Sequence, residues 1–148
     1  MVSTSGHVLL EDEAVETVKR ELFPLATLAT PNLHEAALLL RDGRAIKGVP
    51  DMERAARDLC AMGPAWVLVK GGHLCSGGAG EGPAAGGGAA VDVLCCGESG
   101  VCEQVSSEMI RTTHVHGTGC TLASAIAALM AAGRSVPEAV REAKAYLS

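Results

Sequence analysis

Residues 66–69 are four consecutive apolar side chains, followed directly by Lys70 and two glycines, and this stretch constrains the fold more than any other. A half-buried strand alternates apolar and polar residues, whereas a strand covered on both faces is apolar throughout. Sheets of parallel strands are covered on both faces, because the connections between such strands are helices that pack on the sheet. The stretch therefore predicts an α/β fold with a mostly parallel sheet.

Hydrophobic periodicity and turn residues divide the remaining chain into helices and strands. Helices are predicted over residues 11–22, 33–40, 51–62, 120–132 and 136–146, and further strands over residues 25–30, 91–94 and 101–111. The last two strands are expected to form an antiparallel hairpin that closes the sheet. Two helices begin with capping-box spacing, at Asn32 with Glu35 and at Ser135 with Glu138. Asp51 is expected to cap a third helix.

Residues 76–90 are almost entirely glycine, alanine and proline, a composition typical of a flexible insertion without chemistry. Outside this insertion, the predicted strands supply only about half of a complete parallel sheet. We therefore expect residues 1–148 to be the C-terminal part of a larger domain whose N-terminal half is missing. Such a chain would act as a homodimer or as part of a longer, multi-domain protein.

Composition argues against several classes of partner and location. The net charge of −5 is unlike the basic face of a nucleic-acid-binding protein. A run of about 18 apolar residues is absent from the sequence, so no membrane span is predicted. The first residues lack the layout of a secretory signal peptide, and we expect an intracellular protein, in the cytoplasm or a plastid. The six cysteines lack zinc-ligand spacing and are expected to be reduced thiols.

A second informative stretch is Gly117-Thr118-Gly119-Cys120, which lies where a strand turns into the most apolar helix of the chain. Glycine adopts backbone conformations that other residues rarely take, so the two glycines suit a tight turn. The first turn of a helix has N–H groups without helical partners, at the positive end of the helix dipole. Such a turn can bind phosphate. Taken alone, the motif is more typical of a tight turn beside a buried cysteine.

Three groups of residues follow predicted strands at their carboxyl ends, where ligands bind in open α/β sheets. They are Asn32 with Glu35, then Lys70, then the turn at residues 117–120. A carboxylate, an ammonium group and a helix N-terminus suit a nucleotide phosphate with Mg²⁺, because lysine pairs with phosphate and magnesium prefers carboxylate and water oxygens. Phosphoryl transfer depends chiefly on positioning and charge neutralisation. The sequence therefore favours a nucleotide-dependent enzyme.

Residues 30–36, 67–73 and 116–122 resemble, in this order, the motifs of the hydroxymethylpyrimidine/phosphomethylpyrimidine kinases of thiamine biosynthesis, which belong to the ribokinase-like superfamily. The resemblance implies a three-layer α/β/α domain. It also implies phosphorylation of 4-amino-5-hydroxymethyl-2-methylpyrimidine, and then of its monophosphate, with ATP and Mg²⁺. The longer protein expected above would be an enzyme of thiamine synthesis.

The resemblance also assigns roles to the glycine-rich turn. Gly117, Thr118 and Gly119 would form the anion hole for the transferring phosphoryl group. Cys120 stands where sugar kinases of the superfamily carry an aspartate base. It would be the catalytic residue that helps to deprotonate the substrate hydroxyl.

The other two groups receive nucleotide and metal roles from the same resemblance. Lys70 would contact the ATP phosphates. Asn32 would bind on the ATP side, and Glu35 would hold Mg²⁺, mostly through water. A capping box explains Glu35 equally well, and one carboxylate can serve both roles.

Three other functions stay open on the sequence. A pyridoxal or pyridoxamine kinase of the same superfamily is the nearest, because the half that binds the substrate is not in this sequence. A non-catalytic fragment that pairs through an unfinished sheet edge is another. The third is a hydrolase that uses Cys120 with His114 or His116. The hydrolase ranks low because it leaves Lys70 without a role.

Overall fold

The computed structural model describes residues 12–71, 90–107 and 118–147. Four strands in these ranges form one sheet in the order β1-β2-β3-β4. The predicted insertion over residues 76–90 lies outside the described ranges, apart from Ala90, with which β3 begins. The strands are β1 Leu28–Ala29, β2 Trp66–Lys70, β3 Ala90–Cys96 and β4 Cys102–Ser107.

The described sheet is mixed, and the expectation of a mostly parallel sheet does not hold for these strands. Only β1 and β2 run parallel, because the hairpin of β3 and β4 supplies the other two strands and β3 pairs antiparallel with β2. β1 is also shorter than the strand predicted over residues 25–30. A 3₁₀ turn over Phe23–Leu25 precedes it, and the N–H of Ala26 donates to the Phe23 carbonyl at 3.1 Å.

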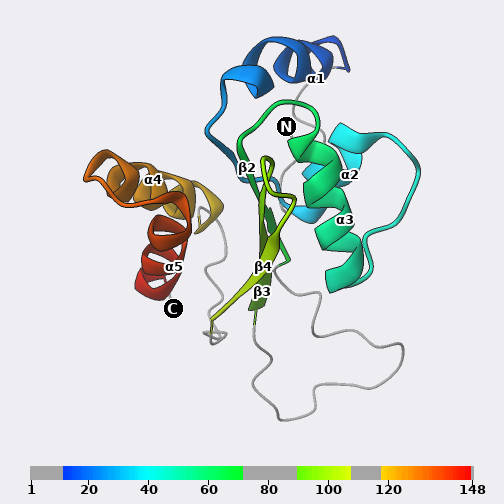
Figure 1. Ribbon diagram of the computed structural model, residues 1–148. Coiled ribbons are helices and arrows are strands. Elements are labelled where there is room, and N and C mark those ends of the chain that lie inside the picture. Colours follow the sequence, from blue (N-terminus) through cyan, green and yellow to red (C-terminus); the bar gives the residue numbers. More distant parts are fainter. Residues whose placement is uncertain (1–11, 72–89, 108–117, 148) are drawn as a thin grey trace, which may run out of the picture.

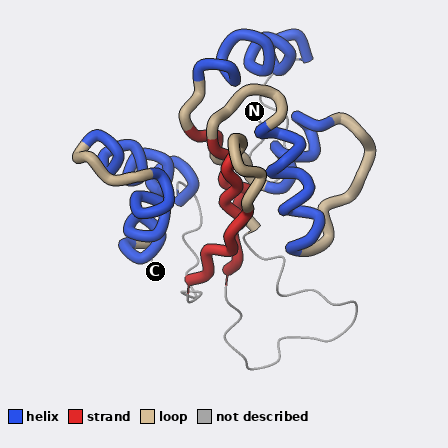
Figure 2. The backbone as a smooth tube through the Cα atoms, viewed as in Figure 1, coloured by secondary structure: helices blue, strands red, loops and turns tan. Residues whose placement is uncertain are grey.

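Helices cover both faces of the sheet and give the molecule three layers (Figure 1). α2 and α3 lie on one face, and α4 and α5 lie on the other, with the strands between them (Figure 2). Within the described residues, each helix is too short or too polar to cross a membrane. The helices are α1 Asp12–Thr17, α2 Leu33–Leu40, α3 Val49–Cys60, α4 Thr118–Ala131 and α5 Val136–Tyr146.

Each face of the sheet has its own apolar core. Side chains alternate between the two faces along a strand. In β2, Val67 and Val69 belong to the core with α2 and α3, and Leu68 belongs to the core with α4 and α5. All three side chains are fully buried, as the apolar run predicts. The same alternation places Lys70 on the face that α4 and α5 cover.

Several helix boundaries differ from the prediction, and α4, for example, begins at Thr118 instead of residue 120. α3 begins two residues before Asp51, because Pro50 suits the first turn of a helix. Asp51 therefore lies in the first turn instead of capping it. Its carboxylate accepts a hydrogen bond from the Lys47 N–H at 2.9 Å, and this bond holds the pKa of Asp51 below its usual value. The helix predicted over residues 11–22 is α-helical only in α1 and continues as a π-helix over Val18–Leu22.

A disulfide joins two of the six cysteines, which corrects the expectation that all are reduced. Cys95 of β3 and Cys102 of β4 are directly opposite in the hairpin register, with their Cα atoms 4.1 Å apart. Spacing in the sequence does not reveal this register. Cys60 and Cys96 are free thiols. Burial, with a smaller effect of Cys96, raises the pKa of Cys60 to about 11, whereas hydrogen bonds with Ser99 lower the pKa of Cys96.

Candidate functional site

Lys70 is the last residue of β2 and lies half-buried beside α4. α4 begins at Thr118, and a methyl group built on the next residue, Gly119, would lie 3.1 Å from Lys70 Nζ. Glycine at position 119 therefore lets the ammonium group approach the first turn of the helix closely. A lysine ammonium and a helix N-terminus both attract anions. The structure thus brings together two of the three groups that the sequence singled out.

The third group, Asn32 with Glu35, lies beside Lys70 at the same edge of the sheet. Asn32 and Lys70 form a parallel β-bridge, and the Lys70 N–H donates to the Pro31 carbonyl at 2.9 Å. The predicted capping box is present, because Asn32 Oδ1 accepts from the Glu35 N–H and Glu35 Oε2 accepts from the Asn32 N–H, each at 2.9 Å. Capping α2 is therefore one confirmed role of Glu35.

Cys120 lies in the first turn of α4 as a free thiol with an exposed side chain. This exposure shows that the interpretation of the motif as a turn beside a buried cysteine is wrong. Thr118 is the first residue of α4. Gly117 lies outside the described residues, as do His114 and His116 of the hydrolase alternative.

Sequence reasoning missed a buried ion pair on the same face of the sheet, formed by Asp92 of β3 and Lys144 of α5. Lys144 Nζ lies 2.7 Å from Asp92 Oδ2, and the two side chains are 8% and 9% exposed, respectively. The other carboxylate oxygen, Asp92 Oδ1, accepts a hydrogen bond from the Gly71 N–H at 2.9 Å. The sequence signals are an aspartate inside an apolar strand and a lysine one helical turn after Val140, on the buried face of α5.

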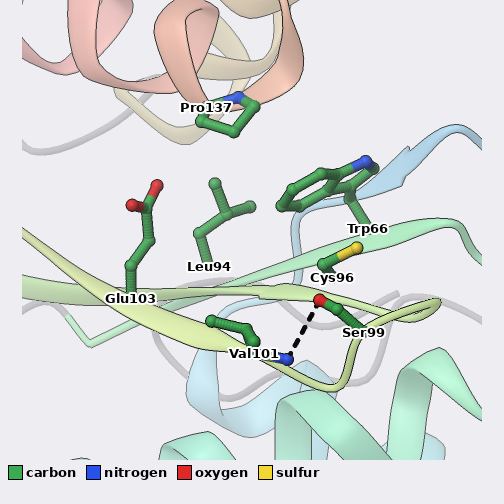
Figure 3. A pocket seen from close by; sticks show the side chains of 7 residues that line it. All are labelled: Trp66, Leu94, Cys96, Ser99, Val101, Glu103 and Pro137. Atoms are coloured by element: carbon green, nitrogen blue, oxygen red, sulfur yellow. Dashed lines mark hydrogen bonds between the residues drawn. The ribbon is translucent and has the colours of Figure 1, made fainter.

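A cavity of about 290 Å³ lies at the opposite end of β2, beside Trp66 (Figure 3). Pro137 of α5 faces Trp66 and Leu94 of the sheet across this mostly apolar space. In the turn between β3 and β4, Ser99 Oγ accepts a hydrogen bond from the Val101 N–H at 3.3 Å. Among the residues that the structure describes, those predicted to form the site do not line this cavity, so the described part of the polar site is separate from it.

The sequence profile of phosphomethylpyrimidine kinases matches residues 1–148. The chain belongs to the phosphomethylpyrimidine kinase family. It is 44% identical over 147 residues to the hydroxymethylpyrimidine/phosphomethylpyrimidine kinase of Streptomyces coelicolor, a match that covers 99% of this chain and 49% of that kinase. It is 43% identical over 147 residues to a chloroplastic thiamine biosynthetic bifunctional enzyme of Arabidopsis thaliana, covering 99% of this chain and 26% of that enzyme.

The fold of this family member is similar to that of a solved kinase structure. An ADP complex of Bacillus subtilis pyridoxal kinase superimposes with a TM-score of 0.77 and 38% identity, over 92% of this chain and 48% of that kinase. The match confirms the α/β architecture that the resemblance implied for this part of the chain. The chain spans about half the length of the Streptomyces and Bacillus kinases. The nucleotide of the Bacillus complex shows that a relative of this family member binds ADP.

The described residues of this phosphomethylpyrimidine kinase family member offer few ligands to a metal ion. In the ranges that the structure covers, no three His, Cys, Asp or Glu side chains are grouped closely enough to hold a metal. Mg²⁺ at nucleotide sites is usually held by one or two carboxylates together with phosphate and water. Glu35 supplies one carboxylate at the N-terminus of α2, bonded to the backbone of Asn32, the residue that bridges to Lys70. The residues present therefore fit an ion that phosphate and water hold for the most part.

Proposed function

We propose that this chain is the C-terminal, phosphoryl-transferring part of an ATP-dependent kinase that phosphorylates 4-amino-5-hydroxymethyl-2-methylpyrimidine and then its monophosphate. The observation that carries the proposal is the close approach of the Lys70 ammonium group to the first turn of α4, in a chain of the phosphomethylpyrimidine kinase family. A full positive charge and the positive end of a helix dipole meet there. The triphosphate of ATP is an anion that suits both.

In this proposal the ATP phosphates lie between Lys70 and α4. Lys70 neutralises phosphate charge, and Asn32 binds on the same side because the parallel bridge keeps it next to Lys70. The N–H groups of Gly117, Thr118 and Gly119 receive the transferring phosphoryl group, whose charge is spread over its outer oxygens. Backbone donors suffice for this role, which is consistent with glycine at two of the three positions.

Cys120 accepts the proton of the substrate hydroxyl from its exposed position in the first turn of α4. The hydroxyl oxygen forms a bond to the γ-phosphorus while the bond from this phosphorus to the β–γ bridging oxygen breaks, and ADP leaves with that electron pair. The hydroxyl proton passes to the Cys120 sulfur. Phosphoryl transfer depends on positioning and charge stabilisation more than on a strong base, so a thiolate is an adequate proton acceptor.

Glu35 is the residue proposed to hold Mg²⁺, mostly through water. The ion, when bound, neutralises negative charge on the phosphates. The capping box fixes the orientation of the Glu35 carboxylate, because its Oε2 accepts the hydrogen bond from the Asn32 N–H at 2.9 Å. The hydrogen bond that caps α2 therefore also holds this carboxylate at the edge of the sheet where β2 ends.

The test is phosphate transfer from ATP to the hydroxymethylpyrimidine. It is measured with this chain alone and with a reconstituted kinase, in which this chain is mixed with the part of the Streptomyces coelicolor kinase that it does not match. We expect transfer by the reconstituted kinase and its loss in Lys70→Ala. Lys47→Ala is the matched control, because Lys47 is an exposed lysine in the loop before α3. Unchanged transfer in Lys70→Ala, or no transfer in either preparation, would contradict the proposal.

A pyridoxal kinase is the second candidate, because the Bacillus subtilis pyridoxal kinase shares the fold at 38% identity. The chain is therefore also mixed with the part of the Bacillus kinase that it does not match, and transfer to pyridoxal is measured. Transfer to pyridoxal in this mixture, together with none to the pyrimidine in the Streptomyces mixture, would favour the second candidate over the first.

A further inference from the structure

Asp92 joins parts of the molecule that are far apart in the sequence. Its Oδ2 lies 2.7 Å from Lys144 Nζ of α5, and its Oδ1 accepts a hydrogen bond from the Gly71 N–H at 2.9 Å. Lys144 Nζ also donates to the Val105 carbonyl of β4 at 2.6 Å. The carboxylate thus links α5 and β4 to the residue that directly follows Lys70.

The location of the pair is unusual for two charged residues. Asp92 and Lys144 are both buried, and they lie on the sheet face whose core includes Leu68, Leu94 and Val105. A buried ion pair adds little stability relative to apolar residues of similar volume, because the loss of hydration of both charges offsets their attraction. Apolar residues would fit this face, so stability alone does not explain the pair. Its contacts with the Gly71 N–H and the Val105 carbonyl do explain it.

The backbone after Lys70 is held from several sides. A Cβ atom on Gly71 would overlap the Val91 carbonyl oxygen and lie 2.8 Å from Met52 Cε, so glycine is required there. The Gly71 N–H is in addition bonded to the Asp92 carboxylate, and a shift of this backbone would leave a buried donor without its acceptor. Because Gly71 directly follows Lys70, these contacts also hold the backbone of Lys70 in place.

We propose that Asp92 and Lys144 are positioning residues that hold the Lys70–Gly71 backbone so that the Lys70 ammonium group meets the first turn of α4. Asp92 acts through the Gly71 N–H. Lys144 acts through Asp92, whose charge it balances and whose orientation it fixes. In this role neither residue touches the nucleotide. The inference rests on the proposed function, because it requires a nucleotide to bind at Lys70.

Two double variants separate the hydrogen bond to Gly71 from the charges. Asp92→Asn with Lys144→Met removes both charges and keeps a side-chain oxygen that accepts from the Gly71 N–H. Asp92→Leu with Lys144→Met removes both charges and this acceptor. The control is Arg141→Ala with Glu103→Ala, which removes an exposed ion pair between the same helix and β4, where Arg141 Nη1 lies 3.0 Å from Glu103 Oε1.

The measurement is the affinity of the 148-residue chain for ADP by titration calorimetry, with thermal unfolding of each variant beside it. We expect Asp92→Leu with Lys144→Met to bind ADP about tenfold more weakly, the effect of one lost hydrogen bond. The asparagine double variant and the surface control should stay within about threefold of the unsubstituted chain. Rescue by asparagine distinguishes positioning through Gly71 from a merely structural role of the charged pair.

Equal ADP affinity in the two folded double variants would overturn the inference and leave the proposed function intact. Absence of ADP binding by the unsubstituted chain would overturn the proposed function, and the inference with it. Where Asp92→Leu with Lys144→Met does not fold, Asp92→Glu takes its place, because the longer side chain keeps the ion pair but displaces the acceptor of the Gly71 N–H. Unchanged ADP affinity in Asp92→Glu would likewise overturn the inference.

Discussion

A helix that begins with a capping box lies near each end of β2, and the two ends differ in the residues that surround this cap. Where β2 ends, α2 begins with a capping box of Asn32 and Glu35, and both side chains are half-buried. Where β2 begins, α5 starts with a capping box of Ser135 and Glu138, and both side chains are exposed. The hydrogen bonds are alike, at 2.9 Å from the Asn32 N–H to Glu35 Oε2 and 3.0 Å from the Ser135 N–H to Glu138 Oε2.

Tertiary contacts make the difference between the two ends. The cap of α2 lies next to the Lys70 backbone, and the Lys70 ammonium group approaches the first turn of α4. The cap of α5 precedes Pro137, which faces Trp66 across an apolar cavity. A capping box by itself therefore does not indicate a functional site, and the residues around it decide whether it belongs to one. Paired substitutions at the two ends test this difference.

The thiols give the largest expected contrast. Cys120 lies in the first turn of α4, and Cys96 of β3 lies opposite Trp66 at the other end of β2. We expect Cys120→Ala to lower kcat of the reconstituted kinase at least about 100-fold, because a positioned proton acceptor contributes that much. Its ADP affinity should change little, and Cys96→Ala should leave kcat unchanged. Initial rates and ADP titrations check both. Equal kcat in the two variants would contradict the catalytic role of Cys120.

The two glutamates give the next contrast. Glutamine also forms capping boxes, so Glu35→Gln and Glu138→Gln each remove a charge and leave the helix capped. We expect the Mg²⁺ concentration for half-maximal rate to rise about tenfold in Glu35→Gln, because residues that hold a metal through water affect its affinity by that factor or more. Rates of the reconstituted kinase measured against Mg²⁺ concentration show whether the two variants differ in their Mg²⁺ requirement. The same Mg²⁺ requirement in both variants would limit Glu35 to capping.

The two N-cap residues separate stability from binding. Asn32→Ala and Ser135→Ala should each lower the free energy of unfolding by about 1 kcal/mol, the usual cost of a lost N-cap. Only Asn32→Ala should also weaken ADP binding, because only Asn32 lies next to Lys70. Urea unfolding and ADP titration of the same samples give both quantities. A loss of ADP affinity in Ser135→Ala as large as in Asn32→Ala would remove the distinction between the two ends.

The smallest expected effect is the pH dependence of the exposed cap. The hydrogen bond with the Ser135 side chain holds the pKa of the Glu138 carboxyl below its ordinary value of 4.5. A carboxyl with a lower pKa in the folded state stabilises that state above the unfolded pKa, and the contribution is lost as the pH falls through the folded pKa. Because glutamine does not ionise, Glu138→Gln should lower the free energy of unfolding above pH 4.5 and flatten its fall at lower pH. Urea unfolding across this pH range measures the slope, and identical slopes would show that Glu138 contributes nothing there.

Much of the fold could be predicted from the sequence, and the failures have a common cause. The apolar run at residues 66–69 is a strand buried on both faces, as predicted. The disulfide between Cys95 and Cys102 was not predicted, because it depends on the register of the hairpin. The mixed sheet was missed for a similar reason, since the sequence does not show which strand lies beside β3.

The sequence by itself determined the buried strand β2, the capping boxes of α2 and α5, and the motifs at Lys70 and Cys120. These features depend on residues within about one helical turn or one strand of each other, where local periodicity and hydrogen bonding decide the structure. Only the tertiary structure decided that Lys70 meets Gly119 and that Asp92 pairs with a lysine 52 positions further along the chain. Contacts over such distances are set by the strand order, the strand register and the face of the sheet on which each helix packs.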